Sequence, residues 1–270
     1  MRSSVSGAAP SPWRSKEPQP GPARSALEAL LTVLLAPACA VCDARLGEPT
    51  RGPVCTRCWH AIPYLTPPLC DRCGDPLPSP RPPSPAAEWC AGCRTRRSAI
   101  TRARAVGPYD GTLREIVHLL KYHRRHTLAV RLGIAMRQCG RAVLADADCV
   151  IPVPLHARRR RARGFNQAAE LAAQLDLPVI HALRRTVATR PQVELPAAER
   201  HRNVAGAFAP ALNRGWRRTW PRLRGARVVL VDDVVTTGAT VEACARVLRG
   251  LAVDDVRVLT LAKVANPRST

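Results

Sequence analysis

"VVLVDDVVTTGAT", residues 228–240, carries an apolar run directly into two adjacent aspartates and then into small hydroxyl and glycine residues. The apolar run is typical of a buried strand, and the following segment, 239–251, is expected to form the next helix. In an open α/β sheet, ligands collect beyond the carboxyl ends of the strands. The stretch therefore predicts a ligand site between a strand and the helix that follows it.

The turn after the strand has the composition of an anion site. Thr236, Thr237, Gly238, Ala239 and Thr240 have little side-chain bulk, so successive backbone N–H groups can surround an anion. The helix dipole adds positive potential and the threonine hydroxyls can donate further hydrogen bonds. This arrangement favours a phosphate monoester. The alternative is an ordinary strand-to-helix turn in which an aspartate serves as a cap.

Asp232 and Asp233 need a different partner, because carboxylates repel a phosphate. They suit the vicinal hydroxyls of a sugar, whose protons carboxylate oxygens accept, or the coordination shell of Mg²⁺. Sugar hydroxyls beside a phosphate ester indicate a ribose 5-phosphate. The stretch contains neither the GxxxxGK[ST] pattern of a P-loop nor the GxGxxG pattern of a dinucleotide site.

Apolar strand-like segments alternate with helical patterns throughout residues 100–265. This alternation predicts an α/β fold with a mainly parallel sheet flanked by helices. A helical pattern over 111–138 is expected to comprise two helices, broken near His123–His126. Strands are expected at 103–109, 149–154, 178–183, 226–233 and 255–264, and further helices at 166–175 and 239–251.

Eight of the eleven cysteines form four CxxC pairs ahead of this region. Two such pairs a dozen residues apart can supply the four sulfurs of a tetrahedral Zn²⁺ shell. Sequential pairing gives two sites most simply, although interleaved pairing with longer connections is the alternative. The sites are expected to be structural, because each shell is filled by sulfur alone. The ligands are Cys39, Cys42, Cys55 and Cys58 for the first site, and Cys70, Cys73, Cys90 and Cys93 for the second.

Two alternatives to zinc remain open from the cysteine pattern. Disulfides would need an oxidising compartment, and the apolar segment near residues 26–37 is a weak export signal. A redox CxxC is normally single and lies in a βαβ unit. The Pro-rich and Ser-rich segment between the third and fourth pairs favours metal, because it offers little core of its own.

The charge of the chain predicts attraction to polyanions. The formal net charge is +22, and only three of the 42 basic residues are lysine. Such a surplus favours binding to phosphates rather than to base edges, although a basic surface without a nucleic-acid role is the alternative. The longest apolar run is too short to span a membrane. We expect a cytoplasmic protein with no membrane span.

The motifs together resemble one known family. "VVLVDDVVTTGAT" looks like the phosphoribosyl pyrophosphate (PRPP) motif of type I phosphoribosyltransferases. With "IPVPLHARRRRARGFNQAAELA", "RPQVELPAAERHRNVAGAF" and the four CxxC pairs, the chain resembles the ComF/GntX family of competence-associated, zinc-ribbon proteins. The resemblance implies a phosphoribosyltransferase-type fold, PRPP with Mg²⁺ as ligand, and a role in natural transformation or use of external DNA.

The resemblance also implies roles for individual residues. Asp232 and Asp233 would hold the ribose hydroxyls, and residues 236–240 the 5-phosphate. The pyrophosphate needs positive charge or free N–H groups near another strand end, which the segment after 151–154 offers. Candidates there and elsewhere are Lys121, Arg158, Arg159, Arg163 and Gly164. An isolated lysine in an arginine-rich chain suggests a need for a compact ammonium. A solvated helix residue is the alternative for Lys121, and a solvated loop or nucleic-acid contact is the alternative for the arginine run.

These inferences divide the chain into three parts. We expect a disordered leader at 1–24, a short helix with a double zinc ribbon at 25–97, and a phosphoribosyltransferase-like domain at 100–265. Three functions remain open: transfer of phosphoribosyl to an acceptor, sensing of PRPP or a nucleotide without turnover, and binding of single-stranded DNA in contact with DNA-uptake proteins. Gln192, Arg200 and Asn203 match the family block, but no role follows for them.

Overall fold

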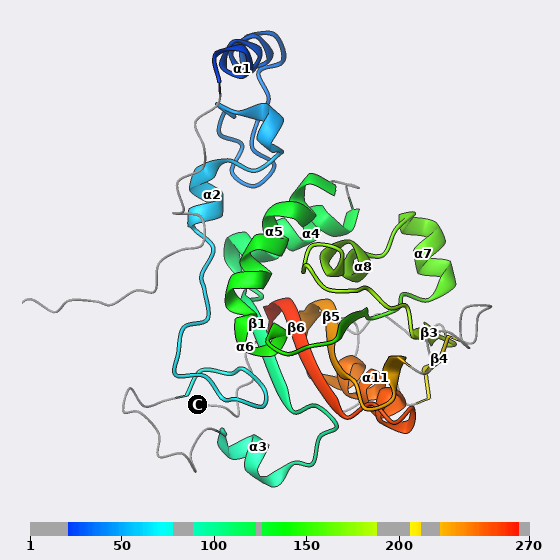
Figure 1. The fold of residues 1–270 in the computed structure, drawn as a ribbon. Coiled ribbons are helices and arrows are strands. Elements are labelled where there is room, and N and C mark those ends of the chain that lie inside the picture. The colour runs from blue at the N-terminus through cyan, green and yellow to red at the C-terminus, as the bar shows by residue number, and fades with distance from the viewer. Residues whose placement is uncertain (1–20, 78–88, 123–125, 188–205, 212–221, 265–270) are drawn as a thin grey trace, which may run out of the picture.

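The computed structural model describes residues 21–77, 89–122, 126–187, 206–211 and 222–264. Four parallel strands form the central sheet in the order β1-β6-β5-β2 (Figure 1). The strands are β1 (Arg102–Pro108), β6 (Asp255–Lys263), β5 (Arg227–Val235) and β2 (Cys149–Pro152). The expected parallel α/β sheet is therefore confirmed, and the strand that carries the aspartates lies inside it rather than at an edge.

The apolar run of β5 is continuous because both faces of the sheet are buried. Val229 and Val231 belong to the core on one face, and Val228 and Leu230 belong to the core on the other. Helices α4 (Gly111–Tyr122), α5 (His126–Cys139) and α8 (Gln167–Ala172) cover the first face, whereas α11 (Ala239–Gly250) covers the second (Figure 1). Two further helices, α6 (Arg141–Leu144) and α7 (Ala157–Arg163), precede and follow β2.

The predicted helix pair over 111–138 is confirmed, since α4 ends at Tyr122 and α5 begins at His126. The predicted strand at 178–183 is wrong. This segment contributes a single bridge, between Val179 and Val150. The chain then leaves the sheet, and β3 (Leu183–Arg185) pairs with β4 (Phe208–Pro210) in a separate antiparallel sheet. Only Ala182 and Leu183 of this segment are buried, while Val179 and Ile180 are half-buried and pack against the cores on opposite faces of the sheet.

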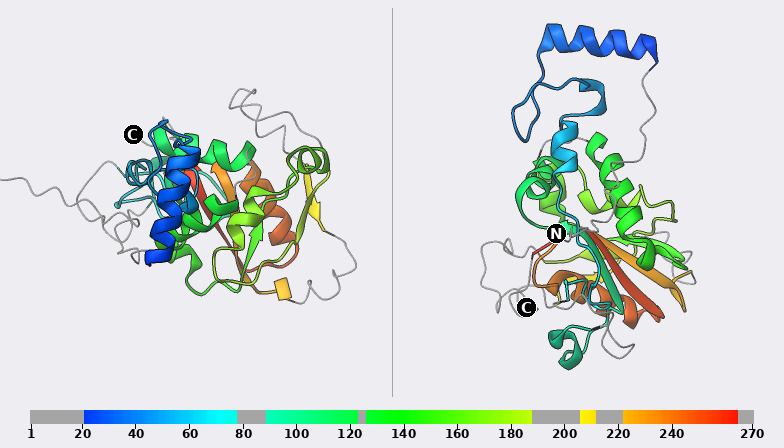
Figure 2. Two further views of the ribbon diagram at one scale, coloured as in Figure 1. Left: turned by 90° about the horizontal axis from the view of Figure 1, so that it is seen from above. Right: turned by 90° about the vertical axis from the view of Figure 1, so that its left-hand side faces the viewer.

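The cysteine-rich half is mostly irregular backbone with short helices. These are α1 (Pro22–Leu35), the 3-10 turn η2 (Pro49–Arg51), α2 (Thr56–His60) and α3 (Ala91–Thr95). Figures 1 and 2 show α1 and the first cysteine cluster extending beyond α5, while α3 lies at the opposite end of the sheet. Helix α1 begins three residues before the expected start, and residues 1–20 of the expected leader lie outside the described residues. The proposed division of the chain into domains stays a prediction.

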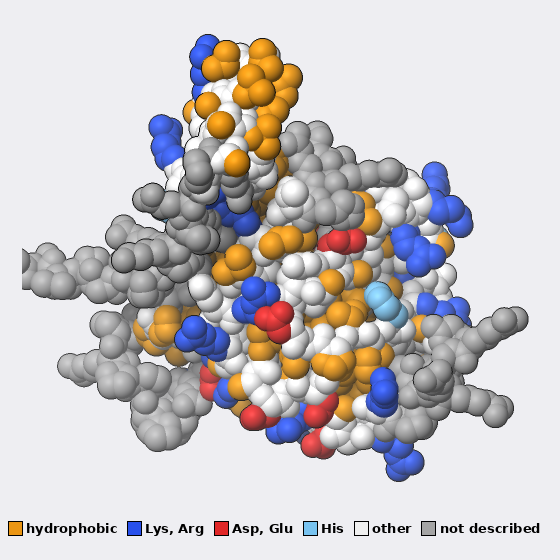
Figure 3. Space-filling model, turned by 45° about the horizontal axis from the view of Figure 1, so that its top comes forward, with side chains coloured by type: hydrophobic (Ala, Val, Ile, Leu, Met, Phe, Trp, Pro, Cys, Tyr) orange, Lys and Arg blue, Asp and Glu red, His pale blue; other side chains and the backbone are white. Residues whose placement is uncertain are grey.

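Helix α1 buries its one acidic residue and exposes part of its apolar surface. Glu28 is buried, and its carboxylate accepts hydrogen bonds from the backbone and the hydroxyl of Thr50. Figure 3 shows the apolar side chains of this helix at the top of the molecule. Those exposed are Leu27, Leu30, Val33, Leu34 and Leu35. No helix within the described ranges combines the length and hydropathy that a bilayer span requires.

The segment between the two cysteine clusters lies along strand β1, the edge of the sheet. The backbone N–H of Leu65 donates to the carbonyl oxygen of Val106 at 3.0 Å. Gly107 allows this approach, because a Cβ at that position would lie 2.2 Å from the carbonyl oxygen of Pro63. The segment that connects the two cysteine clusters thereby contacts the α/β half at Val106 and Gly107 of β1.

Candidate functional site

Strand β5 places its two aspartates on opposite faces of the sheet. Side chains alternate along a strand, so Asp233 shares the face of Val231 and Asp232 the face of Leu230. One oxygen of each carboxylate accepts the backbone N–H of the next residue, at 2.9 Å for Asp232 and 2.7 Å for Asp233. Each therefore keeps one oxygen for a different partner.

Asp233 meets Lys121, which the sequence nominated for pyrophosphate. The lysine lies in the last turn of α4, and its Nζ is 3.1 Å from Oδ2 of Asp233. The two side chains are only 17% and 14% exposed. Burial lowers the pKa of the amine, but Asp233, with smaller contributions from Tyr109 and Asp232, more than offsets this, so the pKa of Lys121 is raised. The structure thus places Lys121 beside a carboxylate at the predicted ribose site.

Asp232 faces α11 and the small β3-β4 sheet. Burial, together with the neighbouring charge of Asp233, raises the pKa of its carboxyl well above the usual range. Arg185 of β3 interacts with it electrostatically and lies over the ring of Phe208, with 5.3 Å between the guanidinium carbon and the ring centre. Burial lowers the pKa of Arg185, and the nearby guanidinium of Arg159 lowers it further. Arg185 thus interacts electrostatically with both Asp232 and Arg159.

The turn at the end of β5 joins this strand to helix α11. Gly238 is the N-cap of α11 with φ of 78°, a left-handed conformation that glycine adopts without strain. The N–H of Ala239 donates to Oγ1 of Thr237 at 3.4 Å, and the N–H of Glu242 donates to the carbonyl of Gly238. The start of a twelve-residue helix therefore lies directly after the strand that carries the aspartates.

The arginine run forms helix α7 rather than a loop. His156 is its N-cap and accepts the backbone N–H of Arg158, and Gly164 ends the helix with φ of 81°. Arg158 and Gly164 are exposed, whereas Arg159 and Arg163 are half-buried. The helix follows β2, whose continuation is hydrogen-bonded to β5 through Val153 and Val231 at 2.9 Å. Arg159 of α7 interacts electrostatically with Arg185.

The eight cysteines gather into two groups, as sequential pairing predicts. Within each group the sulfurs lie within 4.8 Å of one another. The sulfurs of Cys42 and Cys55 are 3.7 Å apart, as are those of Cys73 and Cys90. A tetrahedron with metal–sulfur bonds of about 2.3 Å has edges of about 3.8 Å, so the described positions fit Zn²⁺. The groups are Cys39, Cys42, Cys55 and Cys58, and Cys70, Cys73, Cys90 and Cys93.

The second group is fixed to the sheet by ion pairs. Lys263, the last residue of β6, lies 2.7 Å from the buried carboxylate of Asp75 and donates to the carbonyl of Cys73 at 2.6 Å. Arg104 of β1 lies 2.6 Å from the carboxylate of Asp71. At the other end, Glu242 accepts hydrogen bonds from Oγ of Ser98 at 2.6 Å and from the backbone of residue 99 at 3.0 Å.

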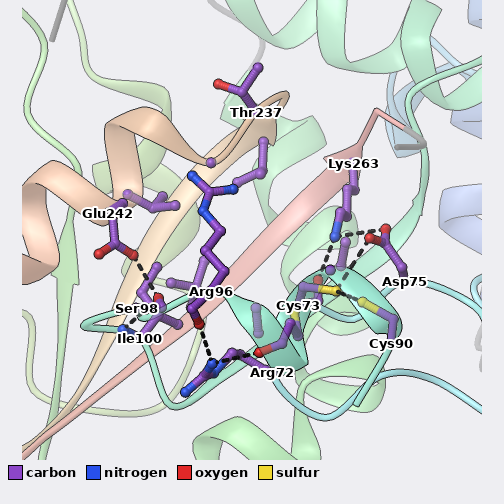
Figure 4. Close-up of a pocket in the computed structure, with 18 of the residues that line it drawn as sticks. Arg72, Cys73, Asp75, Cys90, Arg96, Ser98, Ile100, Thr237, Glu242 and Lys263 are labelled. Carbon is purple, nitrogen blue, oxygen red and sulfur yellow. Dashed lines mark hydrogen bonds and ion pairs between the residues drawn. The ribbon is translucent and has the colours of Figure 1, made fainter. Parts of the chain in front are cut away.

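A cavity of about 530 Å³ separates this second group from the sheet (Figure 4). Its floor is apolar and includes Ala103, Val241 and Val258. Part of its rim is the turn of residues 236–238, and Arg72 and Arg96 line it from the cysteine-rich side. The described lining contains neither the aspartates of β5 nor the arginines of α7. The cavity therefore adjoins the predicted phosphate turn but not the predicted ribose position.

Sequence reasoning missed Arg185 and Lys263. Lys263 has the same signal that singled out Lys121, since it is also an isolated lysine in an arginine-rich chain. Arg185 has no such signal, because its approach to Asp232 depends on the β3-β4 sheet. Gln192, Arg200 and Asn203 lie outside the described residues.

Comparison with known proteins agrees with this architecture. A family model described as a double zinc ribbon domain matches residues 30–94, and one described as a phosphoribosyl transferase domain matches residues 161–270. Competence protein F of Haemophilus influenzae is 32% identical over 187 residues, covering 66% of this chain and 79% of that protein. DNA utilization protein YhgH of Salmonella typhimurium is 33% identical over 189 residues, covering 64% and 74%. Competence protein ComFC of Bacillus subtilis is 28% identical over 157 residues, covering 57% and 61%.

The fold and the cysteine groups define a double-zinc-ribbon protein with a phosphoribosyltransferase-type domain. Within that class, the chain belongs to the ComF/GntX family, which includes these competence and DNA-utilization proteins. The double zinc ribbon match covers the residues that form the two sulfur groups. The family match and the positions of the sulfurs therefore both support structural zinc.

Proposed function

We propose that this protein binds PRPP, as its Mg²⁺ complex, at the carboxyl end of β5 and acts in the uptake or use of external DNA. The observation that carries the proposal is the order of groups along one strand and turn. Two carboxylates, a turn of small residues and a helix start follow one another from Asp232 to Ala239. The phosphoribosyl transferase match over residues 161–270 supports it.

Each part of PRPP has a proposed place. The carboxylates of Asp232 and Asp233 accept the protons of the ribose hydroxyls, and the N–H groups and hydroxyls of residues 236–240 hold the 5-phosphate. Arg159 and Arg185 are the favoured contacts for the pyrophosphate, since both are positively charged and Arg185 interacts electrostatically with Arg159 and Asp232. Arg158, Arg163 and Gly164 of α7 remain candidates. When bound, Mg²⁺ neutralises pyrophosphate charge and assists its departure.

Lys121 acquires a double role in this proposal. In the described state it neutralises Asp233. Binding of the sugar at Asp233 would free the ammonium to turn toward the pyrophosphate, which keeps it among the candidate contacts. Positive charge develops on the ribose as pyrophosphate leaves, and two carboxylates beside the ring stabilise that charge.

Calorimetric titration with PRPP, with and without Mg²⁺, tests the binding site. We expect saturable heat with the wild-type protein and none with Asp232→Asn combined with Asp233→Asn. Asp254→Asn removes an exposed carboxylate elsewhere and should bind like the wild type. Unimpaired binding by the double variant would refute the ribose assignment.

Turnover and sensing need a separate experiment, because both require the same pocket. Release of pyrophosphate in the presence of nucleobases and other amine acceptors would establish a transferase. Binding without release, over a panel of acceptors, would favour a PRPP or nucleotide sensor.

Binding of single-stranded DNA is the second candidate function, favoured by the net charge of +22 and by the names of the relatives. Figure 3 shows Lys and Arg side chains on the side of the molecule where α7 lies. Charge-driven binding releases counterions, so affinity should fall steeply between 50 and about 200 mM salt. Affinity that is insensitive to salt would contradict this mode. A cytoplasmic location and contact with DNA-uptake proteins stay predictions.

A further inference from the structure

The cavity beside the second cysteine group is lined by both the cysteine-rich half and the α/β half of the molecule. Thr236, Thr237 and Gly238 line it from the end of β5, and Arg72 and Arg96 line it from the cysteine-rich side. Figure 4 shows Arg96 extending across the cavity, with its guanidinium between Glu242 and Lys263 and directed toward the turn of Thr237.

The backbone at Arg96 is positioned by the second cysteine group. Arg96 follows α3, the helix that contains Cys93 and is preceded by Cys90. Arg72, one residue before Cys73, donates from Nη1 to the carbonyl of Cys93 at 2.9 Å and to the carbonyl of Arg96 at 2.7 Å. Its guanidinium also lies 4.1 Å from the ring centre of Trp89. A metal that holds the sulfurs therefore also holds the base of the Arg96 side chain.

In the described lining of the cavity, no residue comes from the first cysteine group. Cys39, Cys58 and Trp59 are buried in the core on the face covered by α4 and α5. Arg131 of α5 lies over the ring of Trp59 at 4.8 Å. The two groups have the same ligands but different surroundings, so their effects on a phosphate ligand can be separated by experiment.

We propose that the second zinc ribbon is part of the phosphate site, with Arg96 as a further contact for the 5-phosphate held at residues 236–240. This rests on the proposed function, since it assigns another residue to the same pocket. The ligand is a pentose phosphate, whose ester phosphate takes the guanidinium as an additional donor. Because binding linkage is reciprocal, zinc at the second group and phosphate at the turn stabilise each other.

Substitution of Arg96 gives the first test. We expect Arg96→Gln to weaken PRPP and ribose 5-phosphate by about tenfold, in line with loss of one charge-assisted hydrogen bond. Inorganic pyrophosphate should bind unchanged, because it occupies the other end of the site. Arg97→Gln is the matched control, since Arg97 is the next residue, is exposed and does not line the cavity.

Cysteine substitution gives the second test. Cys93→Ser and Cys42→Ser each remove one half-buried ligand, and each should cost about one zinc per chain. We expect Cys93→Ser to weaken PRPP at least tenfold, and Cys42→Ser to stay within about threefold of the wild type. Ribose 5-phosphate at saturation should slow the release of one of the two zincs to a chelator.

The outcomes separate this inference from the proposed function. If the wild type binds PRPP and Arg96→Gln binds it equally well, the role of Arg96 is overturned while the PRPP site stands. Equal losses in the two cysteine variants would overturn the coupling to the second group. A wild type that binds neither PRPP nor ribose 5-phosphate overturns both proposals. Since Arg96→Gln leaves every cysteine in place, the test holds even if Cys93→Ser fails to fold.

Discussion

Asp232 lies where charge is costly for folding and useful for binding. Its carboxyl is buried near the carboxyl end of the central strand β5 and lies next to a second carboxylate. Both effects raise its pKa. Groups with strongly shifted pKa values are frequent at functional sites, because a bound ligand can provide the hydrogen bonds or charges that the folded protein does not provide. The position is therefore expected to trade stability for affinity.

Asp232→Asn should make the protein more stable at neutral pH. The wild-type carboxyl has a folded-state pKa above its unfolded value, so ionisation opposes folding at any pH above about 4. We expect the variant to be more stable than the wild type at pH 7, because it removes a buried charge that the folded state disfavours. The gain should disappear as the pH falls below about 4, where the carboxyl is protonated in both states. Urea unfolding at several pH values measures it, with Asp254→Asn as an exposed control.

Lys121→Met should destabilise the protein by leaving Asp233 without its cation. Breaking a buried ion pair from one side costs about 3 kcal/mol. Lys121→Met combined with Asp233→Asn should recover most of that loss, because no uncompensated charge remains. A double-mutant cycle of unfolding free energies gives the coupling. Additive losses in the double variant would show that the pair at 3.1 Å contributes nothing to stability.

At the scale of elements, strand β1 and the segment before it depend on close backbone contact. Gly107 lies opposite Pro63, and the side chain of Leu113 approaches it from α4. A side chain at this position has no room, so the contact explains the glycine without reference to function.

Gly107→Ala should therefore be strongly destabilising. The added Cβ would lie 2.2 Å from the carbonyl oxygen of Pro63 and 2.8 Å from a methyl group of Leu113. Overpacking of this kind costs about 1–3 kcal/mol. Gly250→Ala is the control, since nothing lies within 4 Å of its Cβ position at the end of α11. Thermal unfolding of both variants measures the difference, and equal melting temperatures would contradict the close contact.

Local patterns in the sequence predicted the elements that depend on local signals. The apolar run before Asp232 predicted a buried strand, and the spacing of the CxxC pairs predicted which sulfurs meet. The strand at 178–183 was wrong because an apolar run reports burial and not the sheet in which burial occurs. The pairs that connect the two halves are invisible in sequence, since Lys263 and Asp75 meet only through the complete fold.

At the scale of the whole molecule, the two predicted zinc sites are packed against the hydrophobic core and the sheet of the α/β half. The first cysteine group is continuous with the core beneath α4 and α5, and the second is held by β6 and α11. Irregular backbone between the cysteines cannot supply this order alone, so metal binding and folding are linked.

The intact protein should contain two zinc ions per chain by elemental analysis. Removal by a strong chelator should lower the melting temperature and make eight more thiols reactive toward a thiol reagent, because each site holds four. Cys149 and Cys244 are buried in the second core and should react only on unfolding. Reaction of the eight thiols without a change in melting temperature would show that the metal adds no stability.

The attachment of residues 63–74 along β1 has a consequence for any shortened form of this protein. A fragment beginning at residue 97 would keep the whole parallel sheet yet lose the segment whose Leu65 pairs with Val106, and so expose part of the outer edge of that strand. Bare strands of this kind recruit other chains. Truncation at this boundary should thus yield self-associating material, and the cysteine-rich half would have been acting as the cover that keeps neighbouring molecules apart.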